Sequence, residues 1–169
     1  MFTSQVPLLV MALALGASAT PIDPITTTYS STSNVSSNSN QVTVTGKTEG
    51  ANTGTIFRFG DPAAARKIFW ESGSCGLSTY FAEKVDGKIP LVAFPESVMK
   101  QHGASQNNKL CGKVATLKSK GKTMKVVVAD TNVSPEHSID MTSDVWTFFG
   151  QKDGDGSHKD FQIQWSIDM

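Results

Sequence analysis

The closing segment of the chain alternates strictly between apolar and polar residues, and this alternation constrains the fold more than any other feature. It reads FQIQWSI over Phe161–Ile167, and a period of two residues predicts a strand with one buried face. Other short runs rich in β-branched or aromatic residues also predict strands: Thr55–Phe59, Leu91–Phe94, Lys113–Leu117 and Thr123–Ala129. Because turn residues separate these runs, we expect an all-β domain, either a compact barrel or a sandwich.

Two short helices are expected beside the strands, at Pro95–Gln101 and Ser143–Phe149. For the second helix, Thr142 is a residue type that caps helix starts, Asp144 favours the first turn, and Gly150 can end the helix. The helices are therefore predicted to be small additions to a β domain.

The first 19 residues are predicted to be a cleavable signal peptide. They hold an apolar run from Val6 to Leu15, which is too short to span a bilayer, followed by the small residues Ala17, Ser18 and Ala19. Cleavage before Thr20 would release a soluble, secreted protein.

Residues 20–53 are predicted to form a flexible Ser/Thr/Asn-rich segment ahead of a folded domain at residues 54–169. The segment contains TTTYSSTSNVSSNSN and few large apolar side chains, so burial cannot offset the entropy lost on ordering. Asn34 begins an Asn-Val-Ser glycosylation sequon, which fits a secreted glycoprotein.

The chain has two cysteines, Cys75 and Cys111. In an oxidising compartment such a pair most simply forms one disulfide. The alternative, a free catalytic thiol, would need a nearby base and a reason to stay reduced.

Charge and motif content exclude several functions. Fifteen basic residues balance fifteen acidic ones, which argues against a nucleic-acid binder. No metal or cofactor is predicted, because the three histidines lack ligand spacing and there is no phosphate loop, dinucleotide fingerprint or G-x-S-x-G elbow. The segment from Asp153 to Ser157 is similar to a calcium loop, but its glycine comes too early and no glutamate stands at the closing position. We interpret it as a polar turn.

Lysines concentrate around a predicted hairpin with Gly121 at its tip. They are Lys109, Lys113, Lys118, Lys120, Lys122 and Lys125. Two interpretations stay open: a solvated hairpin, or a patch that contacts acidic wall polymers or other anionic surfaces.

Two carboxylates are candidates for chemistry. Asp130 ends an apolar strand, and Asp140 lies ten residues later between Ile139 and Met141. Apolar neighbours tend to raise the pKa of a carboxyl group, as a general acid requires. An equally good interpretation is structural, since aspartates often cap helices or fix turns.

The order of these motifs resembles a known fold. The segments are FRFGDP, GSCG, LVAFP, NNKLCGK, KGKTMKVVVAD, SIDMT, FFG and IQWSI. Together they resemble the six-stranded double-psi β-barrel of expansins, barwin-like and rare-lipoprotein-A-like proteins, and most closely the single-domain fungal loosenin-type proteins. The resemblance covers residues 54–169.

The resemblance implies roles for particular residues. Cys75 and Cys111 match the family's disulfide, Asp140 matches the aspartate that protonates the leaving oxygen in related endoglucanases, and Asp130 matches an aspartate near the polysaccharide groove. Asp61 is the only candidate for the second carboxylate that inverting hydrolysis requires. A second cysteine pair common in the family is absent, because residues 131–135 read TNVSP.

Sugar faces stack on aromatic rings, so five aromatic residues are candidates for glycan binding. These are Phe57, Phe59, Trp70, Tyr80 and Trp146. Trp165 alternates with Phe161 and Ile163 and is assigned to the core.

Three functions follow from these observations. The leading one is a secreted, monomeric, expansin-like protein that binds or loosens cellulose, chitin or pectin without hydrolysis. The second is a protein-binding module on the same fold, such as a protease inhibitor or a host-directed effector. The third is a weak endoglucanase with Asp140 as general acid.

Overall fold

The computed structural model describes residues 32–36, 43–154 and 161–169. The predicted signal peptide and most of the segment from 20 to 42 lie outside these ranges. For Asn34 only the backbone is described, so the predicted glycosylation site is not tested. Among the described residues, no helix is both long enough and apolar enough to cross a membrane.

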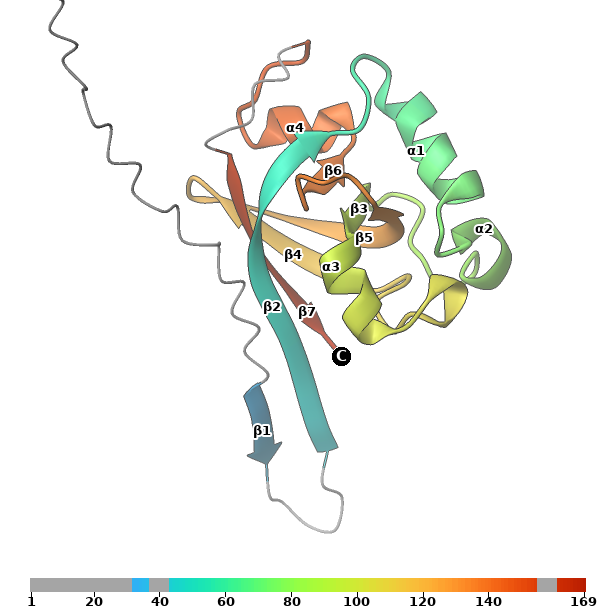
Figure 1. Ribbon diagram of the computed structural model, residues 1–169, viewed down its shortest axis with the longest axis vertical. Coiled ribbons are helices and arrows are strands. Elements are labelled where there is room, and N and C mark those ends of the chain that lie inside the picture. Colours follow the sequence, from blue (N-terminus) through green and yellow to red (C-terminus); the bar gives the residue numbers. More distant parts are fainter. Residues whose placement is uncertain (1–31, 37–42, 155–160) are drawn as a thin grey trace, which may run out of the picture.

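Six strands close into a mixed β-barrel in the order β2-β6-β3-β5-β4-β7, and β7 pairs back with β2 (Figure 1). The strands are β2 (Thr43–Ile56), β3 (Leu91–Pro95), β4 (Val114–Ser119), β5 (Lys122–Asn132), β6 (Ile139–Met141) and β7 (Gln162–Asp168). The β2–β6 and β3–β5 pairs are parallel and the others are antiparallel. This closed mixed barrel confirms the all-β prediction, decides for a barrel over a sandwich, and agrees with the double-psi architecture.

Strand β2 begins well before the predicted domain start at residue 54. Residues 47–53 pair with β7, and the beginning of β2 pairs with β1 (Thr32–Ser36), so part of the segment expected to be flexible belongs to the sheet (Figure 1). The cause is on the inner face of β2. There the ring of Trp165 lies against Gly50 and the ring of Phe161 against Gly54, too close for any side chain at either glycine. The apolar groups of this layer come from β7, which explains why the composition of β2 did not predict a buried strand.

The barrel interior follows the alternation of β7. Phe161, Ile163, Trp165 and Ile167 are all buried, which confirms Trp165 as a core residue. The Trp165 ring meets Phe94 of β3 edge to face at 5.1 Å, and its indole N–H donates to Asn52 Oδ1 over 2.8 Å. The polar end of the indole is thus satisfied inside the barrel.

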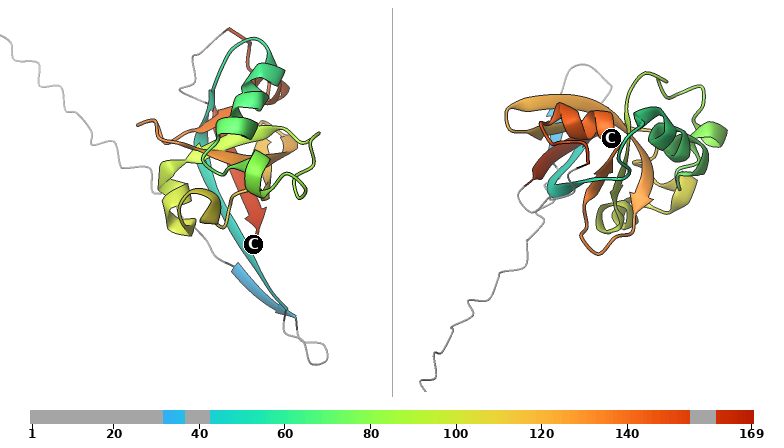
Figure 2. Two further views of the ribbon diagram at one scale, coloured as in Figure 1. Left: turned by 90° about the vertical axis from the view of Figure 1, so that its right-hand side faces the viewer. Right: turned by 90° about the horizontal axis from the view of Figure 1, so that it is seen from above.

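In the described part of the chain, four short helices and two single turns of 3-10 helix surround the barrel. They are α1 (Pro62–Ser72), α2 (Leu77–Tyr80), α3 (Glu96–Met99), α4 (Ser143–Phe148), η1 (Lys100–His102) and η2 (Ser105–Asn107). Helices α1 and α2 pack together on one side of the barrel (Figures 1 and 2). Both predicted helices are present, as α3 with η1 and as α4, whereas α1 and α2 were not predicted.

The start of α4 departs from the prediction in one detail. Thr142 occupies the cap position, but its side chain makes no capping hydrogen bond, and its buried Oγ1 has no partner among the described atoms. Gly150 follows the helix with φ of 84°, a backbone conformation that favours glycine.

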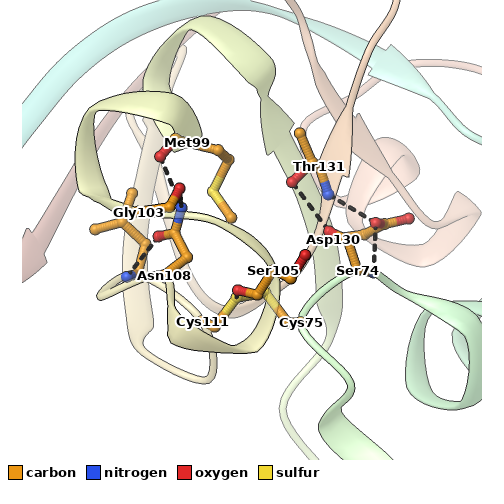
Figure 3. Close-up of a disulfide and its surroundings, with 10 residues drawn as sticks. Ser74, Cys75, Met99, Gly103, Ser105, Asn108, Cys111, Asp130 and Thr131 are labelled. Carbon is orange, nitrogen blue, oxygen red and sulfur yellow. Dashed lines mark hydrogen bonds between the residues drawn. A yellow bond between two sulfur atoms is a disulfide. The ribbon is translucent and has the colours of Figure 1, made fainter.

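Cys75 and Cys111 form a disulfide, as predicted. It joins the turn before α2 to the segment that leads into β4 (Figure 3). The backbone beside it is also tied to β5, since Cys75 N–H donates to Ala129 O.

Removal of the disulfide with Cys75→Ala/Cys111→Ala should destabilise the protein by roughly 4 kcal/mol, the value that the chain-entropy model gives for a loop of this length. Urea unfolding of the parent and the double variant measures the difference. A loss below about 1 kcal/mol would show that packing around the turn, rather than the cross-link, holds this region.

The pKa of His102, which lies in the loop closed by the disulfide, depends on its surroundings in the folded protein. Partial burial, and secondly the nearby positive charge of Lys109, lower the pKa of the His102 imidazole from its ordinary value of 6.5. The unfolded chain therefore binds more protons than the folded chain between the folded pKa and 6.5, and stability falls as the pH drops through that window. Lys109→Gln should raise the His102 pKa in an NMR titration, whereas Lys113→Gln should leave it unchanged. A His102 pKa unchanged by Lys109→Gln would contradict the assignment.

Candidate functional site

Asp140 and Asp130 lie in one row across neighbouring strands. Ala93 of β3 is the register partner of Asp140 on β6 and of Asp130 on β5, and Asp140 is in turn the partner of Thr55 on β2. Directly paired residues point to the same face of a sheet, and two strand spacings separate the two aspartates by roughly 9–10 Å. We call Thr55, Asp140, Ala93 and Asp130 the acidic row.

The acidic row lies on the outer face of the barrel. Its neighbours in sequence, such as Ile139, Met141 and Phe94, are completely buried, whereas both aspartates are partly exposed. Ala93 and Thr55, the other two members of the row, are buried, so the two aspartates are its accessible groups.

A chain of hydrogen bonds leads to Asp140. Asn132 Nδ2 donates to Ser138 Oγ over 3.0 Å, Ser138 Oγ lies 2.7 Å from Thr55 Oγ1, and Thr55 Oγ1 donates to Asp140 Oδ1. The Thr55 hydroxyl has one proton, which it donates to Asp140, so in the Ser138–Thr55 hydrogen bond the Ser138 hydroxyl is the donor. The network therefore presents a donor to the carboxylate.

Asn132 also braces the loop that follows β5. Its Oδ1 accepts from Ser134 N–H over 2.9 Å, and its Nδ2 donates to Ser138 O over 3.0 Å. Between these anchors Val133 is 73% exposed and His137 has φ of 50°. The hydrogen bonds of Asn132 thus fix the backbone of the loop, while the apolar side chain of Val133 is exposed to solvent.

Asp130 has a structural role at the other end of the row. Its Oδ1 accepts from Ser74 N–H over 2.8 Å and from Thr131 N–H over 2.7 Å, and the Ser74 and Thr131 hydroxyls lie 3.0 Å apart (Figure 3). Ser74 precedes the disulfide residue Cys75, so Asp130 fastens the disulfide turn to β5. The same contacts fix the position of its carboxylate.

Asp61 is the N-cap of α1. Its Oδ1 accepts from Ala63 N–H over 2.8 Å, and Pro62 occupies the first position of the helix. It belongs to the loop and helix after β2 and is not part of the acidic row. Its side chain has the structural role of a helix cap.

Three of the five aromatic candidates for glycan binding are exposed: Phe57, Phe59 and Tyr80. Phe57, two residues after Thr55, is 38% exposed, and its ring packs at 4.7 Å on the buried Phe69. Tyr80 is 55% exposed and its ring lies against Gly76, close in sequence to Ser74. Phe59 is also exposed, in the loop before α1.

The two other aromatic candidates lie elsewhere. Trp70 of α1 is half-buried and lines a shallow hollow of about 340 Å³ with Ala63, Arg66, Lys67 and Gly87. Trp146 is completely buried in the core, where its ring meets Phe161 edge to face at 5.3 Å. It cannot line a surface site, so the assignment of Trp146 to glycan binding was wrong.

Arg66 is fixed beside the Trp70 hollow. Its guanidinium donates to Ile89 O and Gly87 O, both over 2.7 Å. Partial burial lowers the pKa of Arg66 below its ordinary value, and the charges of Asp144 and Asp86 act in the opposite direction. The residue therefore pins the loop of residues 87–89 to α1.

Sequence reasoning missed the residues that support Asp140. Thr55, Ser138 and Asn132 carry no local signal of their role, because Thr55 and Ser138 are 83 residues apart and meet only through the parallel β2–β6 pair. In the part of the chain that the structure describes, no three His, Cys, Asp or Glu side chains are close enough together to hold a metal ion.

No protein-family model and no curated protein matches this chain. Among solved structures, the chain is similar to the Streptomyces papain inhibitor (SPI), with 22% sequence identity and a TM-score of 0.43. The alignment covers 72% of this chain and 93% of the inhibitor.

Thr55→Val should destabilise the protein by about 1–3 kcal/mol, because it removes the buried Thr55 hydroxyl from its hydrogen bonds with Ser138 and Asp140. Thr55→Ser should restore most of that loss. Thr116→Val, on the outer face of β4, serves as the matched control and should change stability by less than about 0.5 kcal/mol in urea unfolding. Equal losses for Val at positions 55 and 116 would count against the network.

Proposed function

We propose that this protein is exported and binds neutral cell-wall polysaccharide through the acidic row, without cleaving it. The observation that carries the proposal is the pair of partly exposed carboxylates, Asp130 and Asp140, on one outer face of the barrel, with the exposed Phe57 two residues after Thr55. The disulfide between Cys75 and Cys111 supports an extracellular location.

The chemistry of the acidic row suits a sugar chain. Carboxylate oxygens only accept hydrogen bonds, and sugar hydroxyls are abundant donors. Phe57 and Tyr80 offer ring faces on which pyranose rings can stack. A polyuronate would be repelled by the two carboxylates, so the row favours a neutral glycan such as cellulose or chitin.

The surroundings of both aspartates argue against hydrolysis. Asp140 Oδ1 already accepts a hydrogen bond from the Thr55 hydroxyl. Asp130 accepts two backbone N–H groups, and Asp61 caps a helix. None of the three is set up as the acid and base pair of an inverting glycosidase.

A second candidate function is protein binding through the loop after β5. Val133 is the most exposed large apolar side chain among the described residues, and Asn132 fixes both ends of its loop. Preorganised loops lose little entropy on binding, which suits recognition of a protein partner. This candidate places the function outside the acidic row.

Pull-down on cellulose and chitin tests the polysaccharide proposal. Asp140→Asn removes the charge and part of the acceptor capacity, so we expect about tenfold weaker binding, the cost of one charge-assisted hydrogen bond. Asp168→Asn, an exposed change of equal charge at the end of β7, should bind like the parent. Neither the parent nor a variant should release reducing ends from soluble glucan.

Three other outcomes would overturn parts of the proposal. Failure of the parent to bind either polymer would refute binding at the acidic row. Reducing ends that appear with the parent and vanish with Asp140→Asn would identify an endoglucanase. Glycan binding unaffected by Asp140→Asn but lost on Val133→Asp would move the binding surface to the loop after β5.

A further inference from the structure

The tip of the β4–β5 hairpin forms a second surface site. A hollow of about 400 Å³ lies between the tip and β7, and it is lined by Lys118, Ser119, Lys120, Gly121, Lys122, Thr123, Gln162 and Gln164. We call these residues the lysine hollow. Lys120 and Gly121 form the turn with φ of 48° and 76°, which matches the twist of a tight hairpin.

Aromatic rings hold two of the three ammonium groups of the hollow in place. Lys120 Nζ lies 5.9 Å from the centre of the Phe161 ring, and Lys122 Nζ lies 5.6 Å from the centre of the Phe148 ring. Lys122 Nζ also donates to Phe148 O over 2.7 Å. An ammonium has three donors, so both groups can still bind a ligand, and less side-chain entropy is lost when they do.

None of the described residues that line the hollow carries a carboxylate. Among the described residues, none of its lysines forms an ion pair. The positive charge of Lys118, Lys120 and Lys122 is therefore available to an anionic ligand.

Neutral hydrogen-bonding groups alternate with these charges. Gln164 is the register partner of Lys118, and Gln162, Ser119 and Thr123 complete the polar lining. A ligand that fits both kinds of group carries carboxylates and hydroxyls together. Gln162 is positioned by its own contact, since its Nε2 donates to Thr53 Oγ1 over 3.1 Å.

We infer that the lysine hollow binds an acidic polysaccharide of the polyuronate class. The inference goes beyond the proposed function, because it uses different residues and the opposite charge. Lys122 and Asp130 are at opposite ends of β5, roughly 25 Å apart along the strand. The hairpin tip also lies on the side of the barrel away from α1 and α2 (Figures 1 and 2). At such a separation the effects of substitutions at the two sites should be independent.

Affinity electrophoresis in polygalacturonate tests the inference. The triple variant Lys118→Gln/Lys120→Gln/Lys122→Gln should bind the polymer with about tenfold lower affinity and be retarded less than the parent. Rising salt should also reduce the retardation of the parent, because salt screens exposed charges. Lys67→Gln/Lys84→Gln/Lys88→Gln makes the same change in net charge on the side of α1 and α2 and should bind like the parent. Thermal melting verifies that both triple variants are folded, and Lys118→Gln alone, which disturbs no ring contact, should show a smaller loss of the same kind.

The remaining outcomes separate this inference from the proposed function. Equal weakening in both triple variants would show that net charge alone attracts the polymer and would overturn the inference. Poly-glutamate bound as tightly as polygalacturonate would overturn the polyuronate class in favour of an acidic protein. Cellulose binding without polygalacturonate binding would refute only the lysine hollow, and the reverse would refute only the acidic row.

Discussion

Closure of the barrel between β2 and β7 is the constraint on which the rest of the structure depends. It requires glycine at two positions on the inner face of β2, because the rings of Trp165 and Phe161 of β7 lie against Gly50 and Gly54. With β2 fixed in this way, its final residues Gly54–Ile56 are free to pair in parallel with β6. The position of Asp140 therefore follows from packing between two other strands.

The acidic row is a product of strand order. Strand β3 lies between β6 and β5 in the barrel although it is consecutive with neither in the chain, and its residue Ala93 pairs with an aspartate on each side. Each aspartate is then held by different partners. Asp140 ends a network of side-chain donors that begins at Asn132, whereas Asp130 accepts backbone N–H groups beside the disulfide turn. One row of the sheet thus combines fixed carboxylates with a small central residue.

Overall neutrality conceals a separation of charge along β5. The chain has equal numbers of acidic and basic residues, yet one end of this strand carries a carboxylate of the acidic row and the other carries a lysine of the lysine hollow. Composition averages over the surface, while binding depends on the charge within about a Debye length of the ligand. The two ends of β5 can therefore prefer glycans of opposite character.

The sequence by itself determined the features that depend on neighbouring residues. The alternation in Phe161–Ile167 predicted the strand and the buried Trp165, Gly121 marked the hairpin tip, and the single cysteine pair predicted the disulfide. Tertiary structure alone decided the features that join distant segments. The sequence of β2 did not predict a buried strand, because the apolar side chains that pack at Gly50 and Gly54 come from β7. Thr55 contacts Asp140 only because β2 and β6 pair in parallel. The position of Trp146 was also decided by tertiary structure. The residues next to it in the sequence allow its ring to lie either on the surface or in the core, and packing against Phe161 places it in the core.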